Sequence, residues 1–323
     1  MNKLSLIQKF VVCPVCYSGL DLKNGYMECP LCEKNYVIYD NDIVSTVDKI
    51  EEDVEFSRDK WDEYYHDEDF QKEAERVYNL STLPLVLKQL FEYISENREK
   101  TKTFLEIGCG QASLGEEMVK RGWLFIGIDY SLHILESVKK RLESQSIDNY
   151  ILIHGDITSL PVRSDSIDFI YGGGVIEHFK DSQPVVNHLF RVLKEDGVSF
   201  NSVPFVNIGN MVYRSMWGSI PNIVVIRQIA EFVNIKLLKG KHMRFGYELQ
   251  YTAGQLRKMH LLAGFKNEKI FIDRFDYTVT LEFVKNKLLR RFLTYLIKTN
   301  RHFWQMVKVI GIKHSGRTEK TVG

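Results

Sequence analysis

From residue 103 onward, the chain alternates between short apolar runs and stretches in which apolar residues recur every three or four positions. The first pattern predicts buried strands and the second predicts amphipathic helices. The predicted strands are Phe104–Ile107, Leu124–Ile128, Tyr150–Ile153, Asp168–Tyr171 and Val198–Val203, and the predicted helices are Ser113–Arg121, Leu132–Glu143 and Val185–Lys194. This alternation predicts an α/β fold with a doubly wound, mostly parallel sheet that binds ligands beyond the carboxyl ends of its strands.

The segment after these strands predicts an insertion and then further regular elements. Residues 204–251 are rich in Trp, Met, Tyr and Lys, and a loop of that length is usually functional or contains its own helices. We therefore expect a helical lid there. Thr252 is a helix cap for a stretch that ends at Gly264, and Glu268–Ile272 and Tyr277–Phe283 predict two closing strands.

The last part of the chain, residues 284–323, predicts a basic helical tail. No Asp or Glu occurs from Lys285 to Lys313, and the apolar positions there are Leu288, Leu289, Phe292, Leu293, Leu296 and Ile297, with Phe303, Trp304, Met306 and Val307 continuing the stripe. Such a helix can lie on an anionic bilayer, dock on the sheet or bind RNA.

Residues 49–100 predict an acidic linker followed by lead-in helices. Leu83–Ile94 is amphipathic, and Trp61, Tyr64 and Tyr65 share one predicted helix face. These three aromatic residues either close over a bound ligand or pack on the core.

The charge of the chain is unevenly distributed. The formal net charge is only +1, but residues 201–323 contain 21 Lys and Arg against 7 Asp and Glu, while residues 1–200 contain 22 against 35, which gives +14 and −13. The two parts therefore face different partners. The overall composition, 44% hydrophobic and 26% charged in 323 residues, excludes a disordered, collagen-like or small disulfide-stapled protein.

Two Cys-x-x-Cys pairs near the start predict a metal site. They are Cys13-Pro-Val-Cys16 and Cys29-Pro-Leu-Cys32, separated by twelve residues. Two such knuckles present four thiolates, the closed arrangement of a structural zinc site, whereas a thioredoxin-type redox site needs only one pair. We predict a zinc ribbon over residues 1–48, with no open position for catalysis. With no secretory signal or long uncharged apolar run, the expected location is cytoplasmic.

The strand-to-helix turn Leu105-Glu106-Ile107-Gly108-Cys109-Gly110-Gln111-Ala112 predicts a ligand site, because small residues let the backbone approach a ligand. The dinucleotide fingerprint needs a third small Gly or Ala where this chain has Ser113, so a dehydrogenase is disfavoured. The pattern E-x-G-x-G-x-A resembles the glycine motif of class I S-adenosylmethionine-dependent methyltransferases.

Three further motifs of that family follow in order. Phe125 to Ser131, His154 to Pro161 and Ser166 to Phe179 resemble the second, third and fourth motifs. The resemblance implies a seven-stranded methyltransferase (Rossmann-like) sheet over residues 101–283 and a bound S-adenosylmethionine. Its contacts would come from Glu106 (the amino end), Gly108, Gly110 and Gly172 (space for the methionine part), Asp129 (both ribose hydroxyls), Tyr130, Asp156 (the adenine amino group) and Ile157 (the adenine ring).

His178 is the candidate catalytic base. The resemblance places it beside the transferable methyl group, where it could deprotonate a hydroxyl or an acidic carbon. The alternative is a histidine that only orients this loop. Glu177-His178 also resembles the end of the metal-binding E-x-x-E-H motif of quinone-biosynthesis O-methyltransferases, but Gly174 replaces the first Glu, so we predict no catalytic metal.

The methyl acceptor is predicted from the segments attached to this domain, which are the lid, the zinc ribbon and the basic helix. The lid resembles those of methyltransferases that act on small or lipid-linked acceptors, including cell-surface glycan pathways, so we predict such an acceptor, with a quinone-type one also open. A zinc ribbon before this domain resembles an arrangement found with RNA methyltransferases, which makes RNA the alternative acceptor. A third hypothesis is a non-catalytic partner subunit. If the basic helix binds lipid, the protein would lie peripherally at the inner membrane surface.

Overall fold

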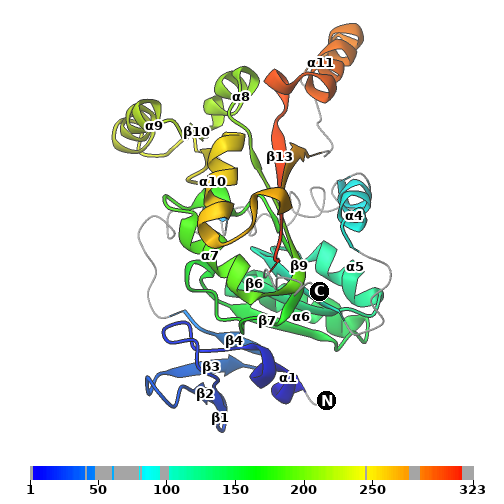
Figure 1. Cartoon of the computed structure of the whole chain (residues 1–323), viewed down its shortest axis with the longest axis vertical. Coiled ribbons are helices and arrows are strands. Elements are labelled where there is room, and N and C mark those ends of the chain that lie inside the picture. The colour runs from blue at the N-terminus through cyan, green and yellow to red at the C-terminus, as the bar shows by residue number, and fades with distance from the viewer. Residues whose placement is uncertain are drawn as a thin grey trace, which may run out of the picture.

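The computed structural model describes residues 3–40, 42–47, 60–61, 80, 82–94, 102–243, 246–275 and 284–314. No helix within these ranges is long and apolar enough to cross a membrane. The main helices in chain order are α1 Lys3–Phe10, α4 Leu83–Phe91, α5 Ser113–Lys120, α6 Leu132–Ser144, α7 Gln183–Val192, α8 Ile208–Tyr213, α9 Val224–Glu231, α10 Ala253–Ala263 and α11 Lys287–Thr299 (Figure 1).

Seven strands form the central sheet, in the order β7-β6-β5-β8-β9-β13-β12. All neighbours pair in parallel except β13, which is antiparallel to both β9 and β12. The strands are β5 Thr103–Ile107, β6 Leu124–Asp129, β7 Tyr150–His154, β8 Ile167–Gly173, β9 Leu193–Pro204, β12 Ile270–Arg274 and β13 Met306–Ile312. This sheet confirms the predicted doubly wound, seven-stranded methyltransferase-like architecture.

Helices cover both faces of the sheet, which explains why its strands are apolar on both sides. One layer contains α4, α5 and α6, whose apolar side chains pack with Phe104, Phe125 and Phe169. The other layer contains α7 and α10, packed on Leu105 and Ile107. Successive residues of one strand therefore enter opposite halves of the core.

The prediction of a helical tail over residues 284–323 was wrong for residues 306–312, which form a strand, and residues 315–323 lie outside the described residues. Helix α11 is capped by Asn286, whose side chain accepts hydrogen bonds from the backbone N–H groups of Leu288 and Leu289, but the chain then returns to the sheet as β13. Val307, Val309 and Ile310 are buried, because this β-branched segment fills the gap between β9 and β12. The predicted strand Tyr277–Phe283 lies wholly outside the described residues, as do Tyr64 and Tyr65.

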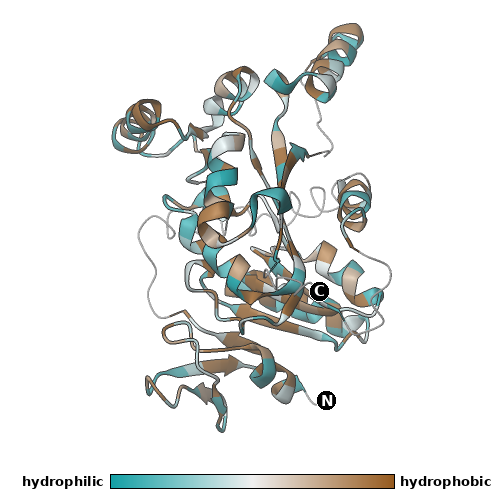
Figure 2. Cartoon of the chain, viewed as in Figure 1, coloured by the Kyte–Doolittle hydropathy of each residue, from teal (hydrophilic) through white to brown (hydrophobic). Residues whose placement is uncertain are grey.

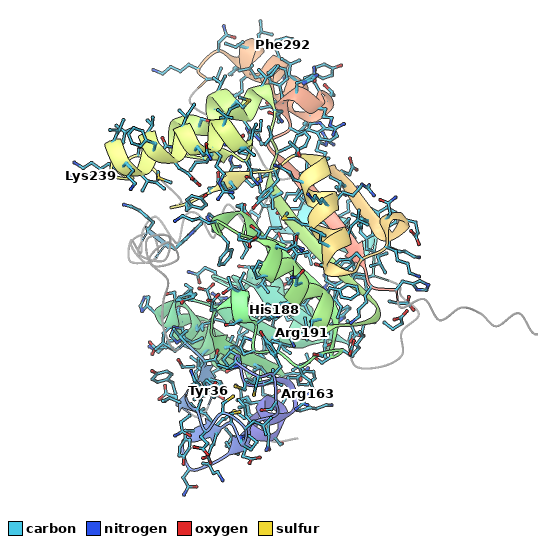
Figure 3. All side chains as sticks on the ribbon, turned by 60° about the vertical axis from the view of Figure 1, so that its left-hand side comes forward. Tyr36, Arg163, His188, Arg191, Lys239 and Phe292 are labelled. Atoms are coloured by element: carbon cyan, nitrogen blue, oxygen red, sulfur yellow. The ribbon has the colours of Figure 1, made fainter. Side chains whose placement is uncertain are left out.

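The N-terminal module joins the same sheet. Its strands are β1 Asp21–Leu22, β2 Tyr26–Glu28, β3 Asn35–Tyr39 and β4 Ile43–Ser45, and β4 pairs in parallel with β7 to extend the sheet to eleven strands. Arg163 donates a hydrogen bond to the carbonyl of Lys9, and Arg191 stacks 4.3 Å from the Tyr17 ring centroid. Figure 3 shows Tyr36, Arg163, His188 and Arg191 together at this end of the molecule. The N-terminal module therefore packs against the main domain as part of the same fold.

The segment 204–251 contains the predicted lid helices. Helix α8 is followed by α9 and the π-helical turn η5 Phe232–Leu237, and the two short strands β10 Ile220–Pro221 and β11 Leu249–Gln250 close its base in parallel. The pairing of β10 with β11 brings together the two ends of the part that contains α9 and η5. The ends of the whole lid meet where Tyr251 N donates a hydrogen bond to the Pro204 carbonyl oxygen.

Replacing Gly115 with alanine should destabilise the fold. A Cβ at this position of α5 would lie 2.3 Å from the Phe125 ring, and Phe125 is fully buried. Overpacking of this kind costs about 1–3 kcal/mol, against a gain of up to about 1 kcal/mol in helix propensity. Thermal unfolding should show a lower Tm for Gly115→Ala.

Gly254→Ala is the matched control for this helix substitution. The nearest atom to a Cβ there is 4.0 Å away, so its Tm should stay the same or rise. Equal effects of the two variants would show that α5 does not pack against Phe125 as described.

Candidate functional site

The glycine loop joins β5 to α5 at the carboxyl edge of the sheet. Gly108, Gly110 and Ala112 all have positive φ, of 54°, 48° and 51°, and the left-handed region strongly favours glycine. A Cβ at Gly108 would lie 2.8 Å from Val175. The loop is therefore bare backbone that a ligand can approach closely.

Asp129 connects this loop to the end of the neighbouring strand β6. One carboxylate oxygen accepts a hydrogen bond from Gly110 N at 2.8 Å, and the other accepts one from Ser131 N at 3.0 Å. An ionised carboxylate only accepts hydrogen bonds, and its two oxygens together offer about four lone-pair positions. The structure thus brings together Gly108, Gly110 and Asp129 as the sequence predicted.

Asp156 and Ile157 follow β7, the next strand of the sheet. Asp156 caps the short helix η2 Ile157–Ser159 by accepting hydrogen bonds from Thr158 N and Thr158 Oγ1, both at 2.7 Å. Ile157 is buried. Tyr130, after β6, stands edge-on to His154 with ring centroids 6.4 Å apart. These residues form the same edge as Asp129.

The side chain of Glu106 is buried, so it is not exposed at the surface of the glycine loop. Its Oε2 accepts a hydrogen bond from Gly115 N at 3.0 Å, and burial raises the pKa of this carboxyl to about 8. The hydrogen bond from Gly115 N to Glu106 therefore connects α5 to β5. Arg141, which the sequence did not single out, supports the same loop by donating to Gln111 Oε1 at 3.1 Å and to the Gln111 carbonyl oxygen.

Gly172 lies at the end of β8, opposite Asn201 of β9. A Cβ at Gly172 would be 2.4 Å from Asn201 Oδ1. Asn201 is fully buried, and its Oδ1 has no hydrogen-bond partner among the described residues, although its Nδ2 donates to Ser199. Sequence reasoning missed Asn201, because a polar residue inside a strand gives no local signal of the neighbour it faces.

His178 ends the short helix η3 Ile176–His178, directly after β8. Its Nδ1 lies 2.6 Å from the carbonyl oxygen of Tyr247 in the lid. A carbonyl oxygen only accepts, so Nδ1 carries the proton and Nε2 is the basic nitrogen of the neutral ring. Burial lowers the pKa of His178 below its ordinary value of 6.5. Trp61 stands edge-on to this imidazole at 6.0 Å.

Glu248, which the sequence analysis did not single out, lies beside Glu177 and His178. One ligand atom each of Glu177, His178 and Glu248 lie within 4.8 Å of one another. Arg214 forms an ion pair with Glu248 at 2.9 Å. Burial raises the pKa of Glu177, with the charge of Glu248 adding to the effect. The group could hold a proton or a cation, and the absence of a catalytic metal stays a prediction.

The four ribbon cysteines come together as predicted. The sulfur atoms of Cys13, Cys16, Cys29 and Cys32 lie within 4.8 Å of one another, with Cys16 Sγ and Cys29 Sγ 3.5 Å apart. Tetrahedral zinc with Zn–S bonds of about 2.3 Å needs sulfur atoms at a similar spacing. Ser18 Oγ lies 3.2 Å from Cys16 Sγ, and this hydrogen bond lowers the pKa of the Cys16 thiol to about 6.

Comparison with known proteins agrees with this geometry. Residues 105–200 match the family described as "Methyltransferase domain". The demethylmenaquinone methyltransferase of Geobacillus stearothermophilus is 28% identical over 107 residues, which cover 32% of this chain and 45% of that protein. The corresponding enzyme of Oceanobacillus iheyensis is 28% identical over 105 residues, or 31% and 44%. The chain thus spans less than half the length of these curated relatives.

Among solved structures, the fold resembles a chain of the complex between the Haloferax volcanii Trm112 methyltransferase activator and its proposed methyltransferase. The TM-score is 0.52 at 14% identity, with 83% of this chain and all of that chain covered. The strand order, the glycine loop and the family match together define a class I S-adenosylmethionine-dependent methyltransferase domain, preceded by strands that present a four-cysteine cluster.

Proposed function

We propose that this protein transfers the methyl group of S-adenosylmethionine to a small or lipid-linked acceptor. The observation that carries the proposal is the Asp129–Gly110 hydrogen bond, which places a carboxylate at the end of β6 against a positive-φ glycine loop. Vicinal ribose hydroxyls are donors that suit such a carboxylate.

The remaining residues of the edge fit the rest of this cofactor. Asp156 would take the adenine amino group, with Ile157 and Tyr130 beside the ring, and Gly108, Gly110 and Gly172 leave space for the methionine part. Glu106 acts indirectly by fixing α5. When bound, the cofactor supplies a methyl group already activated by its sulfonium, so the chain's main task is to hold the acceptor in line and exclude water, where orientation contributes about 7–11 kcal/mol.

His178 is proposed as the base that removes the acceptor's proton. Its Nδ1–H is directed by the Tyr247 carbonyl, which leaves Nε2 to accept a proton as the acceptor oxygen, nitrogen or carbon attacks the methyl group. The lowered pKa keeps the ring neutral at pH 7.

The His178→Ala variant should lose about 10²–10⁴-fold in kcat, the range typical of a general base. On the acid side, the wild-type rate should fall to half its maximum at a pH below 6.5, because burial lowers the pKa of His178 from that ordinary value. Steady-state kinetics across pH, together with calorimetry for S-adenosylmethionine, measure both effects.

The His133→Ala variant is the control. His133 is an exposed residue of α6, so its replacement should leave kcat unchanged. If His178→Ala weakened cofactor binding but not the turnover of bound cofactor, His178 would only orient the loop.

The acceptor class is supported by the character of the lid. Helices α9 and η5 expose apolar side chains, and Lys236, Lys239 and Lys241 lie in or just after η5; such a combination suits an anionic amphiphile. RNA is the second candidate, favoured by the charge of +14 on residues 201–323. The ribbon gives RNA less support, because its only basic residues are Lys3, Lys9, Lys23 and Lys34.

We also propose that the four cysteines bind one structural zinc ion. Two of the four, Cys13 and Cys29, are buried, and four thiolates fill every position of a tetrahedral site. The ribbon would then be a metal-stabilised extension of the sheet. A non-catalytic role for the whole chain, with or without bound cofactor, predicts no methyl transfer. Undetectable binding of S-adenosylmethionine in calorimetry on the purified protein would favour that role.

A further inference from the structure

The lid and the C-terminal helix leave a large apolar surface uncovered by any described residue. No residue of α9, η5 or α11 is buried. Val224, Ile229, Phe232 and Leu237 are all more than half exposed on α9 and η5. Monomeric water-soluble proteins rarely expose contiguous apolar patches of this kind unless the patch has a partner.

The exposed side chains lie on helix faces. On α11, Leu288, Phe292 and Tyr295 follow one another at intervals of four and three residues and are 77%, 56% and 64% exposed. Ile208 and Val212 of α8 repeat the same spacing. Helices that expose an apolar face beside a polar, basic face are typical of elements that lie in a membrane interface.

The charges around these helices have one sign. Residues 205–243 and 284–304 contain 11 Lys and Arg but a single acid, Glu231, which pairs with Arg227 at 2.8 Å. Arg214 is held by Glu248. The other nine basic residues, Lys236, Lys239, Lys241, Lys285, Lys287, Arg290, Arg291, Lys298 and Arg301, form no ion pair with a described carboxylate. Such a surface attracts anionic lipids.

These helices occupy one end of the molecule. Figure 1 shows α8, α9 and α11 at the end opposite the ribbon, Figure 2 shows how much of α9 is apolar, and Figure 3 places Lys239 and Phe292 there, far from Tyr36. An apolar and basic face at one pole can meet a flat bilayer without obstruction by the ribbon.

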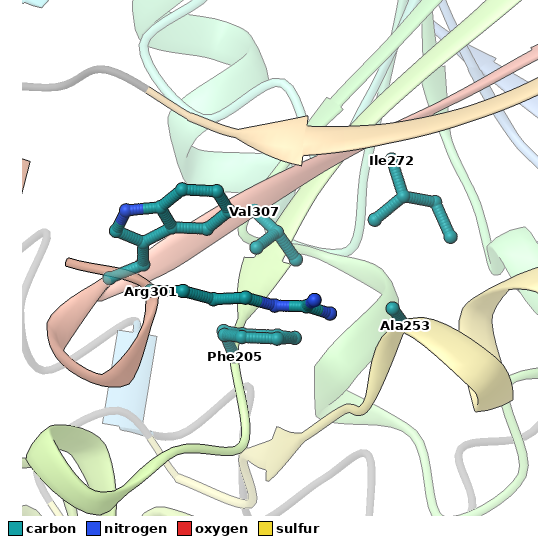
Figure 4. A pocket seen from close by; sticks show the side chains of 6 residues that line it. Phe205, Ala253, Ile272, Arg301 and Val307 are labelled. Atoms are coloured by element: carbon teal, nitrogen blue, oxygen red, sulfur yellow. The ribbon is translucent and has the colours of Figure 1, made fainter. Parts of the chain in front are cut away.

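The base of α11 is fixed to the base of α8. Asn207 donates to the Trp304 carbonyl at 2.5 Å and Asn210 to the Gln305 carbonyl at 2.8 Å. Arg301 stacks 5.3 Å from the Phe205 ring centroid and, with Trp304, lines a hollow of about 130 Å³ (Figure 4). The two helices are thus held together through their bases.

The same face connects to the candidate base. Glu231 at the end of α9 accepts a hydrogen bond from the Tyr247 hydroxyl, and the Tyr247 carbonyl oxygen lies against His178. Helix α9 is therefore linked to the imidazole through Glu231 and Tyr247.

We propose that α8, α9–η5 and α11 form a docking face for an anionic lipid bilayer. Resting on the proposed function, the face also presents a lipid-linked acceptor to His178. A second copy of this chain is a poorer occupant, because each copy would bring nine cations that form no ion pair with a described carboxylate, and these would repel each other. RNA is also poorer, because a nucleic-acid surface offers phosphates but no apolar layer for Ile229 or Phe292 to enter.

Sedimentation of the full chain with vesicles tests the docking face. Vesicles of phosphatidylcholine and phosphatidylglycerol should bind the wild-type chain at low salt, and pure phosphatidylcholine should bind it far less. The double variant Ile229→Ser/Phe292→Ser should bind about tenfold or more weakly through lost apolar insertion. Arg291→Gln/Lys298→Gln should lose a similar factor, and the loss should shrink at high salt.

Leu31→Ser and Lys140→Gln are the controls. Leu31 is 74% exposed on the ribbon, and Lys140 is exposed on α6, so both should bind vesicles like the wild type. Calorimetry with S-adenosylmethionine, without lipid, should give the same Kd for every variant. This separates the two proposals, because loss of cofactor binding with intact vesicle binding contradicts only the proposed function.

Three results would overturn the docking proposal. The first is no vesicle binding by the wild type at low salt. The second is a wild-type dimer in analytical ultracentrifugation that becomes monomeric in Ile229→Ser/Phe292→Ser, which would assign the face to a second copy. The third is tight RNA binding lost in Arg291→Gln/Lys298→Gln while vesicle binding is unchanged.

Discussion

Replacing Asp129 with alanine should weaken the affinity for S-adenosylmethionine about a hundredfold or more. The carboxylate is expected to accept both ribose hydroxyls, and leaving buried polar partners unpaired costs about 1–3 kcal/mol for each. The variant also loses the hydrogen bonds to Gly110 N and Ser131 N, so the glycine loop loses its anchor. Calorimetric titration measures the effect, and a thermal melt shows whether the fold survives.

Asp148→Ala is the control for this substitution. Asp148 is exposed before β7, at the opposite edge of the sheet, so the affinity should not change. Wild-type affinity in a folded Asp129→Ala variant would mean that the ribose does not bind at the end of β6.

Removing the ribbon metal should unfold the N-terminal module. Zinc bound by four thiolates contributes about 10–16 kcal/mol in comparable modules, more than the whole stability of a typical domain. Chelation of the proposed zinc ion, or the Cys13→Ser substitution, should therefore abolish the spectroscopic signal of the folded module. The zinc content found by elemental analysis should fall from about one ion per chain to none. Cys109→Ala should keep its zinc, since Cys109 lies in the glycine loop, outside the cluster.

Loss of the ribbon should also weaken cofactor binding. Ser45 Oγ lies 2.9 Å from His154 Nδ1, and Thr46 N donates to the His154 carbonyl at 2.8 Å. These contacts hold the segment that leads to Asp156. This structural role would be contradicted if protein without zinc kept the spectroscopic signal of the folded ribbon and bound S-adenosylmethionine with unchanged affinity.

The central sheet was predictable because its signals are local. Each strand from Phe104 to Val203 is a short apolar run bounded by a turn residue, and Gly108, Gly110 and Asp129 mark strand ends by residue type alone. The order of motifs along the chain then places these strand ends at one edge. This is why the edge of the candidate site could be outlined before its geometry was known.

Features that depend on distant pairing were not predictable in the same way. Met306 and Val307 fit the apolar stripe of the preceding helix, and only the space between β9 and β12 makes them a strand. The pairing of β4 with β7 joins residues more than a hundred positions apart. Glu248 and Arg214 come from the lid, so nothing near His178 in the sequence indicates that they surround it.

The most direct test of the account is transfer of labelled methyl from S-adenosylmethionine into an extract of source cells, followed by separation into lipid, small-molecule, RNA and protein fractions. We predict label in the lipid or small-molecule fraction, and much less with His178→Ala. Label that is confined to RNA and released by nuclease would contradict the proposed acceptor, and no transfer by a chain that binds the cofactor would contradict the proposed activity.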